Sequence, residues 1–338
     1  MSASLASSAT NTSTNALTDL KEYLSADIGQ VDACMLKMAG SYVPLVSDLS
    51  KYTMFAGGKR LRPLLCLAAA RLCGYQGDAH IDLAASVECM HTATLLHDDV
   101  VDGSLMRRGR ATANDQWGNK ESVLVGDFLL GRAFDLMKAA RSLQVYEILS
   151  HASMVISEGE VLQLTVQGDL SVPRETYFKV VEAKTSVLFA AACQVGAVIA
   201  DAGDKKIEAL RQYGYYLGMA FQIIDDTLDY AADVNALGKR IGDDFREGKV
   251  TLPLLIAYET ASQEDQAFWQ RTITKGEQTE SDIITAIELI KHTGAVEASM
   301  AVANQFIEKA RDSLTLFDHS ELKDKLIAVL DFVIRRSF

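Results

Sequence analysis

Two copies of one short acidic motif constrain this chain more than any other feature. The first copy, DDVVD, occupies residues 98–102, and the second, DDTLD, occupies residues 225–229; each lies inside an apolar stretch. On a helix, the first and last aspartates of such a motif share one face, one turn or about 5.4 Å apart. Like charges at this spacing weaken a helix, and a buried charge without a partner is costly. A hard divalent cation removes both objections, because Mg²⁺ binds one or two carboxylates together with phosphate oxygens. Two such helices facing each other therefore predict a polynuclear Mg²⁺ site that binds a diphosphate.

The hydrophobic pattern of the chain predicts an all-α fold. Apolar residues recur at helical spacing in most of the chain, whereas the alternation typical of strands is hard to find. The predicted helices cover residues 64–72, 83–96, 123–137, 145–161, 177–200, 207–230 and 252–260. The stretches at residues 83–102 and 210–230 are apolar on several faces, as central members of a bundle are. We expect one large helical bundle with a cavity between its inner helices.

Composition restricts the domain organisation and the classes of partner. No Pro/Gly/Ser-rich linker divides the chain after residue 17, so we expect a disordered tail at residues 1–17 and a single domain at residues 18–338. The net charge of −12 argues against a nucleic-acid-binding surface and against a polybasic membrane anchor. No apolar run reaches the length that spans a bilayer, and the first residues lack the features of a signal or transit peptide. The cysteines form no CxxC motif and lie mostly in apolar surroundings, as reduced core cysteines of a cytoplasmic protein do.

Two basic clusters accompany the acidic motifs. The sequence MRRG at residues 106–109 follows the first motif, and GGKRLRP at residues 57–63 precedes a long apolar helix. Arginine forks match phosphate oxygens, glycines let the backbone approach a ligand, and a helix start favours anions. For a single Arg–Asp pair, simple neutralisation of the aspartate would be the preferred interpretation, but two adjacent arginines beside glycine favour phosphate binding. GGKR alone is a weak anion signal and not a P-loop; together with the other clusters it predicts a second, metal-free diphosphate pocket.

Several further polar residues lie close to these motifs in the sequence. His91 precedes Asp98 by two helical turns on the same face, and either a core hydrogen bond or a ligand contact would explain it; His97 points elsewhere. Lys184 and its neighbour Thr185 interrupt an apolar helix, and a glutamine lies three residues before the second motif. Two Gly-Lys pairs, at residues 238–239 and 248–249, predict closing contacts on a bound diphosphate, although a loop lysine is usually solvated.

The chemistry that these groups favour is electrophilic. No Ser/His/Asp or Cys/His nucleophile arrangement is evident in the sequence. Metal ions and arginines can instead draw a diphosphate off an allylic carbon, and the resulting cation is attacked by an alkene. Apolar walls would keep water away from that cation.

The motifs GGKRLRP, HDDVVD, MRRG, KTSVLF, FQIIDDTLDY and GKVTLP resemble those of the trans-isoprenyl diphosphate synthases. The resemblance is strong over residues 40–260, looser elsewhere, and greatest to the long-chain branch, the octaprenyl-to-decaprenyl diphosphate synthases. It implies an all-α prenyltransferase that elongates a farnesyl- or geranylgeranyl-type allylic diphosphate with isopentenyl diphosphate, for the ubiquinone side chain. It also implies a homodimer and about three Mg²⁺ ions per site, for which Mn²⁺ can substitute. Transient membrane contact during product release is compatible with such a product.

The resemblance also assigns roles to residues of this sequence. The metal-binding and catalytic carboxylates would be Asp98, Asp99, Asp102, Asp225, Asp226 and Asp229. The allylic diphosphate would be held by Arg107, Lys184, Thr185, Gln222 and Lys239, of which the two lysines also belong to the catalytic set. Isopentenyl diphosphate would be held by Gly58, Lys59, Arg62, His91 and Arg108. The family usually has GKPTLP where this chain has GKVTLP, which leaves the role of Lys249 open.

Product length depends on how far the growing tail can extend. Ala93 and Thr94 lie one turn before the first acidic motif, where short-chain members of the family carry aromatic rings. One helical turn rises about 5.4 Å, roughly the reach of one isoprene unit, so a product of about C40–C50 needs several turns of open groove. Phe134 and Met137 on a neighbouring helix are candidates for the floor of that groove. Ordinary core packing would explain these side chains equally well.

Three other functions explain the sequence motifs less completely. A terpene cyclase shares the first motif and the fold, but GGKRLRP and an intact second motif argue against it. A metal phosphohydrolase of the HD type could use His97 and Asp98, but it would leave the second motif and the arginines unexplained. A non-catalytic partner subunit usually lacks one or both aspartate motifs, and both are complete here. The exact product length, the primer and the oligomeric state stay open at this level.

Overall fold

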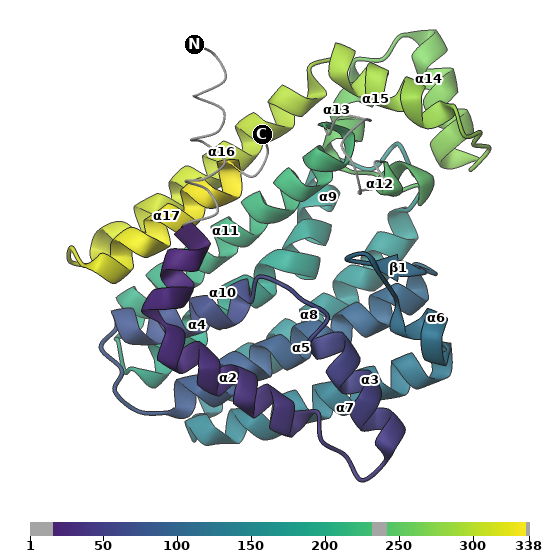
Figure 1. Cartoon of the computed structure of the whole chain (residues 1–338). Coiled ribbons are helices and arrows are strands. Elements are labelled where there is room, and N and C mark those ends of the chain that lie inside the picture. Colours follow the sequence, from purple (N-terminus) through teal and green to yellow (C-terminus); the bar gives the residue numbers. More distant parts are fainter. Residues whose placement is uncertain (1–15, 232–241, 336–338) are drawn as a thin grey trace, which may run out of the picture. The chain divides into compact units, whose positions relative to one another are not determined.

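The computed structural model describes residues 16–231 and 242–335. Within these residues the chain is helical throughout, apart from loops and two strands of two residues each (Figure 1). Contacts divide the chain into two compact units. Unit 1 comprises residues 1–153, 188–214 and 313–329, and unit 2 comprises residues 154–187, 215–312 and 330–338. The division passes through α8, α11 and α17, so parts of these helices belong to each unit.

Unit 1 is built around one long buried helix, α5 (Ala79–Val101). This helix packs against α2 (Ser25–Met38), α4 (Leu61–Leu72) and α7 (Asn119–Met137), as Figure 1 shows. Small side chains along α5 let its neighbours approach, and the Ser86 hydroxyl donates to the Ala133 carbonyl of α7 at 2.8 Å. A Cβ added at Gly196 of α10 (Val187–Ile199) would lie 2.5 Å from the Cys66 carbonyl oxygen of α4, so these two helices also touch through their backbones. α5 is therefore a central member, as its apolar pattern predicts.

The remaining elements of unit 1 are short or peripheral. They are residues 16–23, α3 (Pro44–Met54), β1 (Met106–Arg107), β2 (Arg110–Ala111), α6 (Ala113–Trp117), η1 (Lys138–Ala140), the first part of α8 (Leu143–Val166), η4 (Leu314–Leu316) and most of α17 (Glu321–Arg335). β1 and β2 pair antiparallel and form the only sheet among the described residues. This hairpin begins a few residues after the first acidic motif ends.

Unit 2 surrounds the C-terminal half of α11 (Asp204–Ala231), which carries the second acidic motif. A single π-helical turn, η2 (Glu182–Ser186), interrupts the helix formed by α9 (Arg174–Val181) and α10. The other elements are α12 (Asp243–Arg246), α13 (Leu252–Glu259), α14 (Gln263–Trp269), η3 (Gln270–Thr274), α15 (Asp282–His292) and α16 (Ala295–Ser313). α13 packs against α9, α14 and α15.

The structure confirms the all-α fold class and every helix that the sequence predicts, with ends that differ by a few residues. The sequence predicts one continuous helix over residues 177–200, whereas the structure has the π-helical turn η2 within it. Lys184 and Thr185, which interrupt the apolar pattern, lie at the centre of that turn. The predicted disordered tail lies outside the described residues apart from residues 16 and 17, which begin a helix. The prediction of one domain over residues 18–338 stays a prediction.

One described helical stretch is long and apolar enough, by those two criteria alone, to cross a membrane. It is Arg174–Ile199, which combines α9, η2 and α10, and 72% of its most apolar window is buried. Burial of this kind is common in core helices of folded domains, so the stretch is weak evidence for a membrane span.

Candidate active site

The first acidic motif lies at the C-terminal end of α5. Asp98 and Asp99 occupy the last turn, and the Asp102 amide donates to the Asp98 carbonyl at 2.8 Å, which keeps these two residues one turn apart on the same face. The Asp99 side chain turns inward and is 3% exposed. Burial raises the pKa of Asp99, while the Arg107 Nε, which donates to its Oδ1 at 2.7 Å, opposes that rise. Arg107 therefore neutralises one aspartate of the motif.

The hairpin after the motif sends the two adjacent arginines to different partners. Arg107 ends β1 and pairs with Arg110 of β2, which leaves Arg108 and Gly109 as a two-residue turn. Both turn residues have positive φ, 53° and 74°, as in the tight turns that suit a hairpin. Whereas the Arg107 guanidinium contacts Asp99, an Nη1 of Arg108 donates to the Gly57 carbonyl oxygen of the GGKR segment. The hairpin thus links the first motif with the second basic cluster.

The GGKR segment is a loop whose backbone closely approaches Arg108. Gly58 has a φ of 142°, and a Cβ added there would lie 2.7 Å from the Arg108 Nη1. The backbone conformation favours glycine at this position, whereas the guanidinium is the end of a flexible side chain that can move away from a Cβ. Arg60, which has no predicted role, donates to Glu88 at 2.8 Å and anchors the loop to α5.

Arg62 and His91 form a half-buried pair beside this loop. Arg62 lies in the first turn of α4; its Nη1 lies 3.2 Å from His91 Nε2, and its guanidinium stacks 4.5 Å from the centre of the Phe189 ring. Because a guanidinium only donates, His91 Nε2 accepts this hydrogen bond. Burial lowers the pKa of Arg62 to about 10, and burial followed by Arg62 itself lowers the pKa of His91 well below its usual value. His91 is therefore neutral and leaves the positive charge of Arg62 to an anion.

Two further residues that are predicted to bind isopentenyl diphosphate are Lys59 and Arg108. Both side chains are exposed. Arg108 lies near enough to Arg62 and His91 to lower the pKa of each. Buried Arg62 Nε has no hydrogen-bond partner among the described residues, which suits a basic cluster that binds an anion. Unit 1 thus brings together the residues predicted to bind isopentenyl diphosphate.

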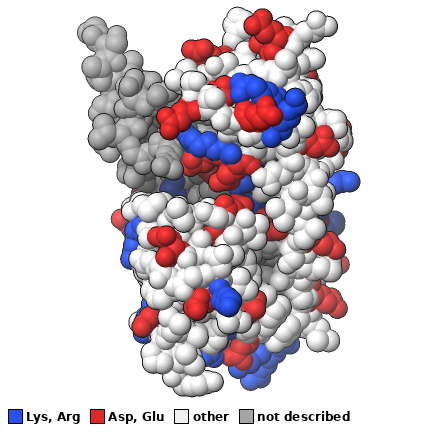
Figure 2. All heavy atoms as spheres, turned by 90° about the vertical axis from the view of Figure 1, so that its right-hand side faces the viewer, with Lys and Arg blue, Asp and Glu red and all other residues white. Residues whose placement is uncertain are grey.

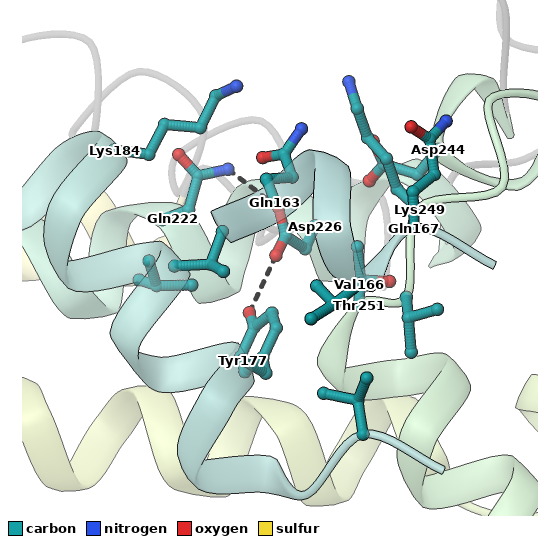
Figure 3. A pocket seen from close by; sticks show the side chains of 14 residues that line it. Gln163, Val166, Gln167, Tyr177, Lys184, Gln222, Asp226, Asp244, Lys249 and Thr251 are labelled. Carbon is teal, nitrogen blue, oxygen red and sulfur yellow. Dashed lines mark hydrogen bonds between the residues drawn. The ribbon is translucent and has the colours of Figure 1, made fainter. Parts of the chain in front are cut away.

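The second acidic motif divides its carboxylates between solvent and the interior of unit 2. Asp225 is exposed, whereas Asp226 is 7% exposed. The Tyr177 hydroxyl donates to Asp226 Oδ2 and the Gln222 amide donates to Oδ1, each at 2.7 Å (Figure 3). Burial raises the pKa of Asp226 to about 7, Asp225 adds to the rise, and Tyr177, Gln222 and Lys249 oppose it. Both oxygens of Asp226 are therefore engaged by neutral donors.

Asp229, the last aspartate of the second motif, contacts backbone amides. Its Oδ1 accepts from the Gly242 amide at 3.1 Å and its Oδ2 from the Asp244 amide at 2.9 Å. These amides belong to the start of α12, so Asp229 caps that short helix from a distance in sequence. Burial raises the pKa of Asp229, and the backbone hydrogen bonds oppose the rise.

The π-turn presents two of the predicted allylic diphosphate residues. Lys184 pairs with Glu160 of α8 at 3.1 Å, and the Thr185 hydroxyl donates to Gln222 Oε1 at 2.7 Å. A Cβ added at Gly159 would lie 2.3 Å from the Cβ of Ala183, so α8 and η2 are in close contact at this point. Lys239, the fifth predicted member, lies outside the described residues.

A pocket of about 90 Å³ opens between these groups in unit 2. Figure 3 shows the side chains that line it, most of them polar, and valines form the remaining wall. The polar lining residues are Gln163, Gln167, Tyr177, Lys184, Gln222, Asp226, Asp244, Lys249 and Thr251. Lys249 lies at the pocket and forms an ion pair with Glu247, and Val250, which replaces the usual proline, lines the wall.

Sequence analysis did not identify Glu160, Tyr177 or Asp244. Tyr177 carries a usable signal, because it precedes Lys184 by seven residues, or two helical turns on one face. Glu160 follows Gly159, which contacts η2. This contact cannot be inferred from the sequence, so the sequence does not identify Glu160 as a site residue. Asp244 lies fifteen residues beyond Asp229, so its pairing with that carboxylate depends on tertiary structure.

The residues predicted to set product length lie on α5 and α7, which pack together. Ala93 is 1% exposed, whereas Thr94 is half-buried and its hydroxyl donates to the His91 carbonyl at 2.9 Å. Met137 is fully buried and Phe134 is half-buried. These positions suit core packing and the floor of a groove equally, so the chain-length assignment stays a prediction.

The charges and donor atoms fit a divalent cation. Over the described atoms of the face shown in Figure 2, acidic and basic side chains are intermixed, and the continuous basic surface typical of nucleic-acid-binding proteins is absent. No group of three or more His, Cys, Asp and Glu side chains among residues 16–231 and 242–335 could hold a metal ion by itself. Mg²⁺ does not need such a cage, because one or two carboxylates, water and substrate phosphates complete its shell. The two acidic motifs supply hard oxygen ligands of this kind.

Comparisons with known proteins show which family this chain resembles. Residues 43–290 match the polyprenyl synthetase family model. The chain is 42% identical over 320 residues to the octaprenyl diphosphate synthase of Escherichia coli strain K12, covering 95% of this chain and 99% of that protein. Among solved structures, a decaprenyl diphosphate synthase from Rhodobacter capsulatus superimposes with a TM-score of 0.92 at 45% identity, covering 95% of this chain and 99% of that one. A polyprenyl synthase from Caulobacter crescentus CB15, complexed with calcium and isoprenyl diphosphate, gives a TM-score of 0.92 at 46% identity, with 95% and 98% covered.

These similarities extend over nearly the whole chain, and the residues that the family model matches contain both acidic motifs, both basic clusters and the π-turn. The family consists of Mg²⁺-dependent prenyltransferases whose substrates are isopentenyl and allylic diphosphates. The protein belongs to the polyprenyl synthetase family.

Proposed function

We propose that this protein elongates an allylic diphosphate primer with isopentenyl diphosphate to all-trans products of octaprenyl-to-decaprenyl length, which supply the ubiquinone side chain. The observation that carries this proposal is the presence of two complete aspartate motifs together with a separate basic cluster around Gly58. A terpene cyclase has no use for that second cluster, and a non-catalytic subunit has no use for both motifs. The octaprenyl and decaprenyl diphosphate synthases named above support the long-chain product.

In this proposal, unit 1 binds isopentenyl diphosphate. Lys59 and Arg108 offer exposed charges, Arg62 offers a half-buried one, and Gly58 lets the diphosphate approach the backbone. Neutral His91 orients Arg62 by accepting from its Nη1. Arg107 remains beside the first acidic motif and contacts the primer diphosphate there.

Unit 2 carries the remaining contacts to the primer diphosphate. Lys184 on the π-turn and Gln222 on α11 line one pocket, and the Thr185 hydroxyl donates to Gln222 Oε1. We extend to Lys249 the role predicted for Lys239, because its side chain lies at that pocket. The valine wall excludes water from the carbon that loses the diphosphate.

Mg²⁺, about three ions per site with Mn²⁺ able to substitute, would neutralise the primer diphosphate as it departs. Asp98, Asp102 and Asp225 are the first candidates for ligands. Asp225 is exposed, and Asp98 and Asp102 lie one turn apart at the end of α5. The remaining carboxylates, Asp99, Asp226 and Asp229, already accept hydrogen bonds from protein donors. Each carboxylate oxygen has a second lone pair, so these hydrogen bonds are compatible with metal binding but restrict the directions from which an ion can approach.

Further parts of the proposal rest on the family resemblance. The protein acts as a homodimer in the cytoplasm, folds as one domain over residues 18–338, and contacts a membrane transiently when it releases its product. The small side chain of Ala93 leaves room for the growing tail, and Phe134 and Met137 end the groove.

Product analysis tests the proposal directly. Purified protein is incubated with Mg²⁺, radiolabelled isopentenyl diphosphate and geranyl, farnesyl or geranylgeranyl diphosphate, and the dephosphorylated products are separated by reversed-phase chromatography. Octaprenyl to decaprenyl alcohols are expected. Only C15 or C20 products in excess isopentenyl diphosphate would refute the long-chain assignment, and no product with any primer would refute the enzyme assignment.

A further inference from the structure

We infer that Tyr177 is a positioning residue for the allylic diphosphate site, which acts through Asp226 on Gln222 and Thr185. The inference rests on the proposed function and assigns to Asp226 a role other than binding metal. Tyr177 lies in α9, outside every motif that the sequence analysis singles out. Its side chain is 5% exposed.

The four side chains form one continuous chain of hydrogen bonds. The Tyr177 hydroxyl donates to Asp226 Oδ2 at 2.7 Å, and Gln222 Nε2 donates to Asp226 Oδ1 at 2.7 Å. The Thr185 hydroxyl donates to Gln222 Oε1 at 2.7 Å. Figure 3 shows the first two of these bonds at the base of the pocket. All three bonds lie within unit 2 and have lengths within the normal range for their types.

Asp226 decides which end of the Gln222 carboxamide faces Thr185. A carboxylate only accepts, so the amide must turn its NH₂ end toward Asp226. Its oxygen then faces η2, where it accepts from the Thr185 hydroxyl. The proton of Thr185 is committed to this bond, which fixes Thr185 and the turn that carries it relative to Gln222.

Tyr177 is the group that keeps Asp226 in this position. Asp226 is buried, and Lys249 lies within electrostatic reach of it. Without the phenolic hydroxyl, Oδ2 would lack its donor, and the carboxylate would rotate toward another one. Rotation removes the acceptor that Gln222 needs, so the carboxamide loses its fixed direction and Thr185 loses its partner.

The same contacts tie the α9–η2 segment to α11 at two points one helical turn apart. Tyr177 contacts Asp226, and Thr185 contacts Gln222, which precedes Asp226 by four residues. Lys184 lies next to the second point of attachment. The Tyr177 hydroxyl therefore fixes the position of the turn that presents Lys184 and Thr185 to the primer.

The test compares Tyr177→Phe, Gln222→Ala and the double variant in steady-state assays with purified full-length protein. Tyr177→Phe should lower kcat/KM for the allylic primer by about 10–100-fold, because misplaced polar groups cost rate without changing the chemistry. The KM for isopentenyl diphosphate and the Mg²⁺ concentration for half-maximal rate should stay within about two-fold of wild type, since neither depends on this chain of hydrogen bonds. In the Gln222→Ala background, Tyr177→Phe should lower the rate by less than about two-fold more, because contacting residues that act together are not additive.

A matched control is available in unit 1. Tyr213 is fully buried and its hydroxyl donates to the Leu326 carbonyl at 2.8 Å, so Tyr213→Phe removes a buried tyrosine hydroxyl bond away from the pocket. It should lower the melting temperature and leave the kinetic constants for the primer unchanged. Calorimetric titration with a non-hydrolysable allylic diphosphate analogue, well below the melting temperature, measures primer binding independently of turnover and should show weaker binding to Tyr177→Phe.

Three results would overturn the inference. They are additive effects in the double variant, equal kinetic losses in Tyr213→Phe, and an increased Mg²⁺ requirement in Tyr177→Phe, which would make Asp226 a metal ligand. Product formation by the wild-type protein separates this inference from the proposed function. If the wild type makes no polyprenyl diphosphate, the proposed function fails and the inference fails with it. If the wild type is active and Tyr177→Phe matches it, the inference alone fails.

Discussion

Replacement of Asp229 by alanine should loosen the segment at residues 242–249 before it affects metal binding. Both oxygens of Asp229 accept backbone amides at the start of α12, from Gly242 at 3.1 Å and from Asp244 at 2.9 Å. α12 is only four residues long, and Lys249 follows it closely at the pocket. A carboxylate that caps this helix therefore also positions a cation that contacts the primer in our proposal.

The expected loss of stability follows from these two hydrogen bonds. Loss of a capping side chain costs about 0.5–2 kcal/mol. The Gly242 amide also donates to the Asp229 backbone carbonyl at 3.0 Å, which the substitution leaves in place, and Asp244 is half-buried, so water can replace its lost acceptor. Asp229→Ala should therefore lower the local stability of this segment by about 0.5–2 kcal/mol. Asp229→Asn, which keeps one acceptor oxygen, should recover part of the loss.

Hydrogen exchange and Mg²⁺ titration together show whether Asp229 caps α12 or binds the metal ion. Amides of residues 242–249 should exchange about 2–30-fold faster in Asp229→Ala when Mg²⁺ is absent, the factor that corresponds to the loss given above. kcat should fall because Lys249 is no longer held in place, while the Mg²⁺ concentration for half-maximal rate should change little. Unchanged exchange together with a large increase in the Mg²⁺ requirement would refute the capping argument and return Asp229 to the metal site.

Three further predictions concern the other groups of the site. Asp98→Ala and Asp225→Ala should each lower kcat by about 10²–10³-fold with unchanged melting curves, because each removes a ligand that holds transition-state charge; near-normal rates in both would contradict the metal assignment. Arg108→Ala should raise the KM for isopentenyl diphosphate, because the Arg108 guanidinium contacts Gly57. Arg107→Ala should raise the KM for the primer, because the Arg107 guanidinium contacts Asp99. Equal effects of each variant on both substrates would show that the two-pocket division is wrong. Ala93→Phe should shorten the product to about C15–C20 while catalysis persists. Because Ala93 is 1% exposed, overpacking should lower the free energy of unfolding by about 1–3 kcal/mol. A product of wild-type length would show that the tail does not pass this position.

Periodicity was sufficient to predict the helices that carry the site. α5 and α11 contain the acidic motifs in long apolar stretches, and the apolar residues on both sides of Lys184 predicted one helix, although not the π-helical turn at Lys184. α16 and α17 were not predicted, although apolar side chains recur in both at helical spacing, for example Ala303, Ile307 and Ala310, all fully buried. Those helices carry none of the predicted site residues, but the spacing of their apolar residues is sufficient to predict them.

The environments of individual carboxylates could not be predicted from the sequence. The two DDxxD motifs have the same spacing, yet the middle aspartate pairs with an arginine in the first and with a tyrosine and a glutamine in the second. Tyr177 and Asp226 are separated by 49 residues, and Asp229 caps amides 13 and 15 residues later. Such partners are chosen by tertiary packing, which periodicity does not encode. A motif therefore predicted the kind of chemistry but not which of its members face a ligand.

Helix polarity gives a physical reason for the positions of the acidic and basic groups. The first motif lies at the C-terminal end of α5, and the second lies in the last described turns of α11, where the Asp229 carbonyl accepts from the Gly242 amide. Helix C-termini carry partial negative charge, so aspartates placed there repel the helix dipole and are stabilised by a cation. Lys59 and Arg62 lie instead around the N-terminal end of α4, where the partial positive charge favours an anion. Each helix end thus adds to the charge that its side chains already carry, so the backbone itself strengthens binding of Mg²⁺ at the acidic motifs and of diphosphate at the GGKR loop.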